Sequence, residues 1–121
     1  MNHALAVAAA LSLGTWALHT FVGGREIAGP LLRSGLHPVP KYTNYYCWHL
    51  VTIVLFAMAA AFAYGAVVPA GRDVAAFALM LSSAFAAWSL ALVRWTRQPP
   101  LRLPQWLLFL AISVVAAVGF A

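Results

Sequence analysis

Charged side chains are scarce in this sequence, and acidic side chains are nearly absent. Only 7% of its 121 residues are charged, and two acidic residues, Glu26 and Asp73, stand against seven Lys and Arg. Soluble domains carry about 25% charged residues, so this shortage excludes a soluble globular domain. No carboxylate falls near the middle of an apolar run, which argues against an exchange of protons for drugs inside the membrane.

Cysteine is equally scarce. Cys47 is the single cysteine, which excludes an internal disulfide bond. The sequence also lacks the CxxC, CxxCH, HxxxH and ExxH spacings that are typical of metal and haem sites. Lys and Arg are missing between Met1 and Leu18, whereas a signal peptide begins with positive charge. We therefore interpret the first apolar run as a membrane span.

Apolar residues are what the chain has in abundance. They make up 64% of it, and the mean hydropathy is +0.89. This length accommodates about four spans of about 20 residues each. We therefore predict an all-α fold, an integral membrane four-helix bundle that forms a single transmembrane domain over 1–121. The four transmembrane helices are expected at approximately 2–22, 45–68, 73–93 and 104–121.

Glycine and proline mark the expected helix ends. Gly23 and Gly24 are predicted to end the first helix. Prolines after this pair exclude a continuous helix and predict a connection of about 20 residues. Pro69–Gly71 predicts a tight turn, and Pro104 predicts the first residue of the last helix, where a missing N–H costs nothing.

Basic residues predict the orientation of the bundle. The first and third connections hold Arg25, Arg33, Lys41, Arg94, Arg97 and Arg102, whereas the second holds only Arg72. The positive-inside rule then places both longer connections in the cytoplasm and both termini on the periplasmic side. We expect a multi-pass protein of the bacterial inner membrane. Its net charge of +5 comes from basic residues that set its orientation in the membrane lipid, and we expect no binding of nucleic acid. The expected anchors at the membrane interface are Tyr42, Tyr45, Trp48, Trp95 and Trp106.

Small residues recur at helical spacing in two of the runs. Ala57, Ala61 and Gly65 follow one another at intervals of four in the second run, as do Ser82 and Ala86 in the third. This pattern predicts close helix packing. It is equally typical of packing inside the bundle and of packing against a second copy or a larger membrane complex.

His19 and His49 are the candidate functional residues, because each lies within an apolar run. Each lies four residues inside a predicted helix end, about 6 Å along the helix axis, and both are expected at the cytoplasmic side. An ionisable residue at membrane depth is a functional-site hypothesis by default. If the first helix persists past the glycine pair, helical spacing places Trp16, His19, Gly23 and Glu26 on one of its faces. The same spacing predicts a face of the second helix with Tyr42, Tyr45, His49 and Thr52. The third run is expected to bring Trp88 and Ser89 to a similar depth.

Several functions compete for this pair. Each histidine is expected either to form a hydrogen bond between helices or to bind a cofactor. The cofactor would be haem b held by His19 and His49, or a transition metal held with the addition of Glu26 or Cys47. Proton or ion transport is a third reading. Catalysis is disfavoured, because Cys47 and His49 are two residues apart and diverge on a helix.

The leading functional hypothesis is a non-enzymatic accessory or assembly subunit of the inner membrane. It rests on the absence of a soluble domain and of a complete catalytic motif. It predicts a homo-oligomer or a larger membrane complex joined through small-residue faces. The alternative is a haem-binding or metal-binding membrane protein for electron transfer or sensing. The third hypothesis is a small transporter.

Overall fold

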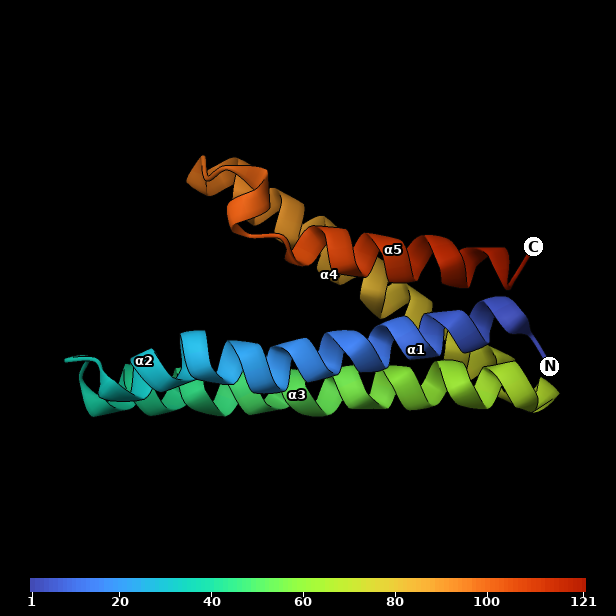
Figure 1. Ribbon diagram of the computed structural model, residues 1–121, viewed down its shortest axis with the longest axis horizontal. Coiled ribbons are helices and arrows are strands. Elements are labelled where there is room, and N and C mark those ends of the chain that lie inside the picture. The colour runs from blue at the N-terminus through green and yellow to red at the C-terminus, as the bar shows by residue number, and fades with distance from the viewer.

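The computed structural model describes residues 1–121 as two antiparallel helical hairpins (Figure 1). The first hairpin pairs α3 with a continuous helix built of α1, the π-helix η1 and α2. The second hairpin pairs α4 with α5. The helical segments are α1 (His3–Ala17), η1 (Leu18–Ala28), α2 (Gly29–Arg33), α3 (Pro38–Val67), η2 (Pro69–Gly71), α4 (Arg72–Thr96), η3 (Pro100–Arg102) and α5 (Gln105–Val118).

The predicted all-α four-helix bundle is confirmed. Three helices are long and apolar enough to span a membrane: His3–Arg33, Pro38–Val67 and Pro69–Thr96. α5 has 14 residues, about 21 Å at 1.5 Å per residue, and is shorter than the expected span over 104–121. Both termini lie at the same end of the bundle (Figure 1), as an even number of antiparallel helices requires.

The prediction that Gly23 and Gly24 end the first helix is wrong. Neither glycine has a positive φ, so neither forms the left-handed cap that ends many helices. The chain instead widens into the 11-residue π-helix η1, in which the N–H of Gly29 donates to the carbonyl of Gly24 five residues earlier. Pro30 is tolerated because it lies at the start of α2, where its missing N–H is not needed.

The predicted connection of about 20 residues is also wrong, because only residues 34–37 separate α2 from α3. Pro38 and Pro40 lie in the first turn of α3. The first N–H groups of a helix have no partner within it, so proline begins this helix instead of breaking it. The predicted turn at Pro69–Gly71 is confirmed as a single 3₁₀ turn.

Small residues pack mainly inside the bundle. A β-carbon at Gly65 would lie 2.6 Å from the Cβ of Ala75, so this glycine allows α3 to approach α4. Ser82 and Ala86 are buried, and the Ser82 hydroxyl is 2.8 Å from that of Ser113 on α5. The close packing predicted from small residues is therefore mostly intramolecular.

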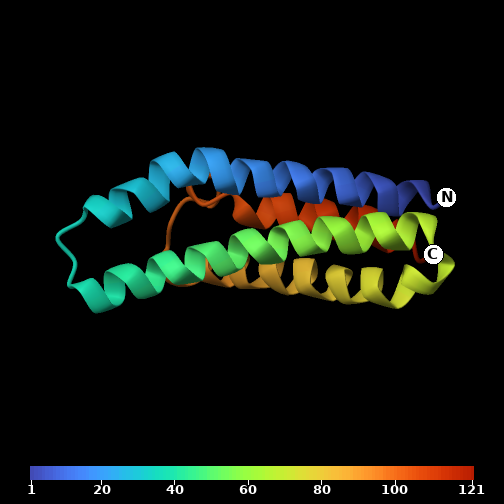
Figure 2. The same cartoon turned by 90° about the horizontal axis from the view of Figure 1, so that it is seen from below.

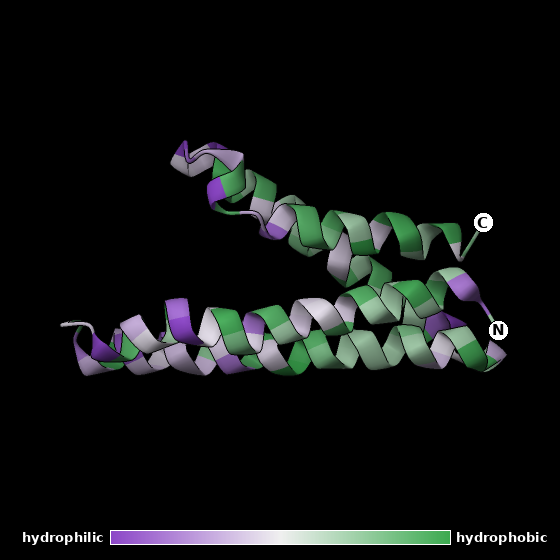
Figure 3. Ribbon diagram, viewed as in Figure 1, coloured by the Kyte–Doolittle hydropathy of each residue, from purple (hydrophilic) through white to green (hydrophobic).

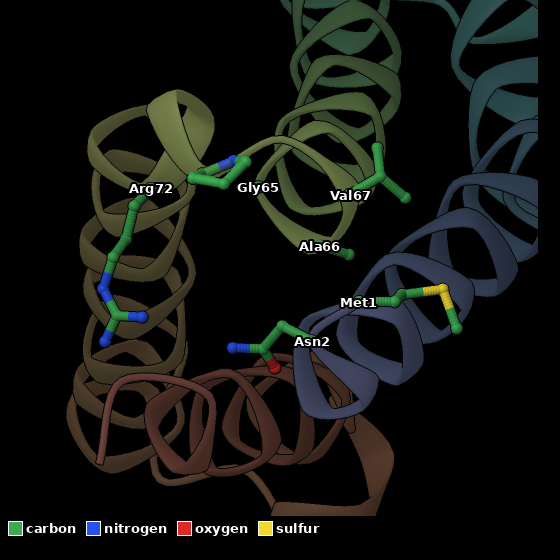
Figure 4. A pocket seen from close by; sticks show the side chains of 7 residues that line it. Met1, Asn2, Gly65, Ala66, Val67 and Arg72 are labelled. Carbon is green, nitrogen blue, oxygen red and sulfur yellow. The ribbon is translucent and has the colours of Figure 1, made fainter.

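Asn2 ties the two hairpins together at the end that holds the termini. Its backbone N–H donates to Ala66 at the end of α3, at 2.7 Å, and its Nδ2 donates to the carbonyl of Gly119, at 2.7 Å. Arg72 donates to the carbonyl of Phe120, at 3.1 Å, and its guanidinium lies over the Phe120 ring. Figure 4 shows Asn2 and Arg72 around the small pocket formed there.

The hairpins diverge toward the opposite end. Near the termini all four helices lie together, whereas the loop between α4 and α5 lies away from the first hairpin (Figure 1). Figure 2 shows that the first hairpin also extends beyond the second. Its tip is more hydrophilic than the middle of the bundle (Figure 3). This divergence positions the candidate site.

Candidate functional site

A cleft of about 450 Å³ lies between the hairpins at the end with the basic connections. The first helix lines it from Thr15 to Ile27, α3 lines it through Trp48, Val51 and Leu55, and the second hairpin lines it from Arg102 to Phe109. Most of its wall is apolar carbon, with a few polar groups. Such a lining is typical of sites for small molecules.

α3 is longer than a membrane crossing requires. It has 30 residues, about 45 Å, whereas a hydrocarbon core of about 30 Å needs only about 20 of them. A span of about 20 residues that ends at Val67 would begin at Trp48, the residue on which His19 stacks.

His19 lies against α3 at Trp48 and Thr52. Its imidazole stacks on the indole of Trp48, with ring centroids 3.9 Å apart and planes 17° apart. Its Nε2 lies 3.1 Å from the Thr52 hydroxyl and 3.3 Å from the Trp48 carbonyl. The first helix is therefore joined to α3 by one ring contact and one shared hydrogen-bonding site.

The hydrogen bonds of His19 depend on which ring nitrogen carries the proton. With the proton on Nε2, the imidazole donates toward the Trp48 carbonyl and the Thr52 hydroxyl, which itself donates to that carbonyl at 3.1 Å. With the proton on Nδ1, Nε2 accepts from the Thr52 hydroxyl. In both tautomers Nε2 is engaged with α3.

Gly23 makes room for the Trp48 side chain. A β-carbon at Gly23 would lie 2.7 Å from Cη2 and 3.1 Å from Cζ2 of that indole. No such contact exists at Gly24, where nothing lies within 4 Å. The two glycines therefore differ in role, because only Gly23 allows the indole to lie flat between the first helix and α3.

Two side chains of opposite charge line the mouth of the cleft. Glu26 enters it from η1, and Arg102 enters it from η3. The Arg102 guanidinium donates to the amide oxygen of Gln98, at 3.4 Å. Gln105, the first residue of α5, lies in the same wall. The cleft thus offers one anionic and one cationic group above an apolar interior.

The predicted polar faces are only partly brought together. His19, Gly23 and Glu26 do line one side of the cleft, because the helix continues past the glycine pair. Trp16 instead lies against Phe21 and Phe56.

His49 does not join His19 in the cleft. Its ring meets the edge of Tyr45, with centroids 4.7 Å apart, and it is exposed on α3. The second predicted face also divides, since Tyr45 packs on His49 while Thr52 turns to His19.

The other candidate ligands are dispersed. Cys47 is an exposed free thiol, and no group of three or more His, Cys, Asp or Glu side chains is placed to hold a metal ion. Glu26 lines the cleft and Cys47 does not.

The predicted interface aromatics have different surroundings. Tyr42 is 61% exposed and Trp95 is 77% exposed, as lipid-facing or interfacial rings are. Trp48 is half-buried on His19. The indole N–H of Trp106 donates to the carbonyl of Pro100, at 3.0 Å, so this ring also fixes the loop before α5.

The contribution of the second hairpin was missed. The cleft wall includes Arg102, Gln105, Leu108 and Phe109. Trp88 and Ser89, the expected neighbours on α4, do not line the cleft, and Trp88 is 62% exposed. The sequence did contain one signal. Arg102 lies two residues before Pro104 and the last apolar run, which places it at the same membrane edge as the predicted end of the first span.

The fold and the apolar helices define a small helical membrane protein. Comparison with protein families, with curated proteins and with solved structures finds no match to this chain.

Proposed function

We propose that this protein is a non-enzymatic accessory protein of the bacterial inner membrane that binds an amphipathic molecule between its two hairpins. The observation that carries the proposal is the cleft of about 450 Å³, whose apolar wall ends in Glu26 and Arg102. An apolar interior with a charged mouth matches a ligand that has an apolar body and a polar head.

The size and place of the cleft support binding from the membrane. Sites for small molecules have volumes of about 300 to 1,000 Å³ and apolar walls with few polar groups. We place the polar mouth at the hydrocarbon edge, because a span of about 20 residues that ends at Val67 begins at Trp48 in the cleft wall. A lipid-like ligand in the cleft would therefore keep its polar head at the edge of the hydrocarbon and its apolar body within the hydrocarbon, as it does in the bilayer.

The orientation is part of the proposal. Six of the seven basic residues lie in the connections at the cleft end, so the positive-inside rule places the cleft mouth in the cytoplasmic leaflet and both termini in the periplasm. The ligand would then enter from the inner leaflet.

Assembly with a second copy or a larger complex stays a prediction. Gly65, Ser82 and Ala86 are used inside the bundle, while Ala57 remains exposed. The apparent mass in native membranes tests the prediction, and a lone monomer would contradict it.

The haem or metal site and the transporter also stay predictions. Nε2 of His19 is engaged with Thr52 and Trp48, so a metal at His19 would bind Nδ1 or displace these contacts. An absorption spectrum and metal analysis of the purified protein test this alternative, and ion flux in proteoliposomes tests transport.

Native mass spectrometry with a matched pair of substitutions tests the proposed function. Val51 lines the cleft, whereas Ile53 lies two residues away on the same helix and is 64% exposed. We expect the wild-type protein and Ile53→Trp to retain one bound molecule after gentle detergent purification and Val51→Trp to lose it. Equal retention by all three proteins, or no retention by any, would contradict the proposal.

A further inference from the structure

We infer that the molecule bound in the cleft is a zwitterionic phospholipid, whose ammonium group lies at Glu26 and whose phosphate lies at Arg102. This inference rests on the proposed function and names the class of its ligand. Its basis is that two opposite charges line the same cleft from different hairpins.

The two charges belong to separate elements. Glu26 lies in η1, and Arg102 ends η3 before the start of α5. Arg102 turns to the neutral amide of Gln98 and not to the carboxylate. A headgroup with one positive and one negative charge can therefore lie between the hairpins and neutralise both, which a singly charged headgroup cannot do.

The phosphate is expected on the side of the second hairpin. Arginine is well suited to phosphate, because its guanidinium donates two parallel hydrogen bonds. Pro104 and Gln105 line the same wall at the start of α5, which has no side-chain cap. The positive end of the helix dipole therefore adds to the attraction that Arg102 exerts.

The apolar part of the ligand is expected deeper in the cleft. Below the charged mouth the walls are Leu18, Val51, Leu55, Leu108 and Phe109. These side chains belong to the first helix, α3 and α5, so an acyl chain between them would contact both hairpins. The lipid would then fill the space where the two hairpins diverge.

The test is a titration of the full-length protein in detergent, read by native mass spectrometry. The probes are phosphatidylethanolamine, whose head is zwitterionic, and phosphatidylglycerol with the same acyl chains, whose head is anionic. We expect the wild-type protein to prefer phosphatidylethanolamine. Glu26→Gln should weaken phosphatidylethanolamine binding about tenfold, the usual size of a lost hydrogen bond to a charged group, and leave phosphatidylglycerol binding unchanged or tighter. Arg102→Gln should weaken the binding of both lipids.

Arg25→Gln is the matched control, because Arg25 is exposed beside Glu26 and does not line the cleft. It should change neither affinity by more than about twofold. A thermal unfolding curve for each variant establishes that it is folded. Saturable binding that Val51→Trp abolishes, but that is equal for both lipids and indifferent to Glu26→Gln, would overturn the headgroup assignment and leave the proposed function intact. Binding that is not saturable, or that Val51→Trp does not affect, would overturn both.

Discussion

Gly23 and Trp48 lie so close together that a β-carbon on the glycine would be 2.7 Å from Cη2 of the indole. The same indole stacks on His19, one helical turn earlier. The first helix therefore holds Trp48 at two points, and the position of this ring sets one wall of the cleft.

Gly23→Ala is expected to destabilise the protein by about 1–3 kcal/mol, the usual cost of overpacking. The added methyl group would push the indole away from His19 and distort the cleft. Thermal or denaturant unfolding in detergent measures the change in the free energy of unfolding. Gly24→Ala is the control, because nothing lies within 4 Å of the new methyl group.

Gly24→Ala is expected to be neutral or to stabilise the helix by up to about 1 kcal/mol, because alanine is the better helix former. If both substitutions have the same effect, the close packing of Gly23 on Trp48 is not what requires glycine there.

His19 and Thr52 are expected to be energetically coupled, because Nε2 is hydrogen-bonded to the Thr52 hydroxyl at 3.1 Å. A double-mutant cycle with His19→Phe and Thr52→Val measures the coupling. The expected value is about 0.6 kcal/mol, and at most about 1.7 kcal/mol, as for other hydrogen bonds between membrane helices. Additive effects of the two substitutions would show that this hydrogen bond contributes nothing to stability.

Asn2→Ala is expected to destabilise the protein by about 1–2 kcal/mol, because it removes a helix cap and a hydrogen bond to the last helix. The Asn2 side chain accepts from the N–H of Leu5, at 3.1 Å, and donates to Gly119. Unfolding measurements on Asn44→Ala provide the control, since Asn44 is exposed and bonds only to Pro40 in its own helix. A smaller loss for Asn2→Ala than for Asn44→Ala would contradict this role.

Cys47 reports the orientation of the bundle, because it is the single cysteine and is exposed at the cleft end. A maleimide that cannot cross membranes is expected to leave Cys47 unlabelled in intact spheroplasts and to label it in inverted vesicles. The variant Cys47→Ser with Ala70→Cys should reverse this result, since Ala70 lies in the opposite turn. Labelling of Cys47 in intact spheroplasts would contradict the topology.

Composition and hydropathy were sufficient to predict the helical membrane fold. The second connection was also predictable, because proline and glycine in Pro69–Gly71 leave few alternatives to a turn. The first connection was not. Gly23 and Gly24 have the composition of a helix end, but the chain continues through them as η1, with Gly23 against the Trp48 indole. A local sequence signal cannot reveal a contact with a residue that lies 25 positions away.

For the candidate site, the partner helix of His19 was predictable but its partner side chains were not. The sequence favoured a neighbour on the second apolar run, and the structure places His19 against α3. Its actual partners, Trp48 and Thr52, depend on how the two helices are turned, which the widened π-helix alters. The divergence of the second hairpin is a property of the whole bundle, so the sequence pattern did not predict that Arg102 and Glu26 would line the same cleft.

Photo-crosslinking in native membranes tests whether the cleft binds one kind of molecule. A photoreactive residue at position 51 would face the cleft, and one at position 53 would face the surrounding lipid. The proposed function predicts that position 51 crosslinks to one molecular species up to one per protein, while position 53 crosslinks to lipids in proportion to their abundance. The same mixture of adducts at both positions would show that the cleft binds nothing selectively and would contradict the proposed function.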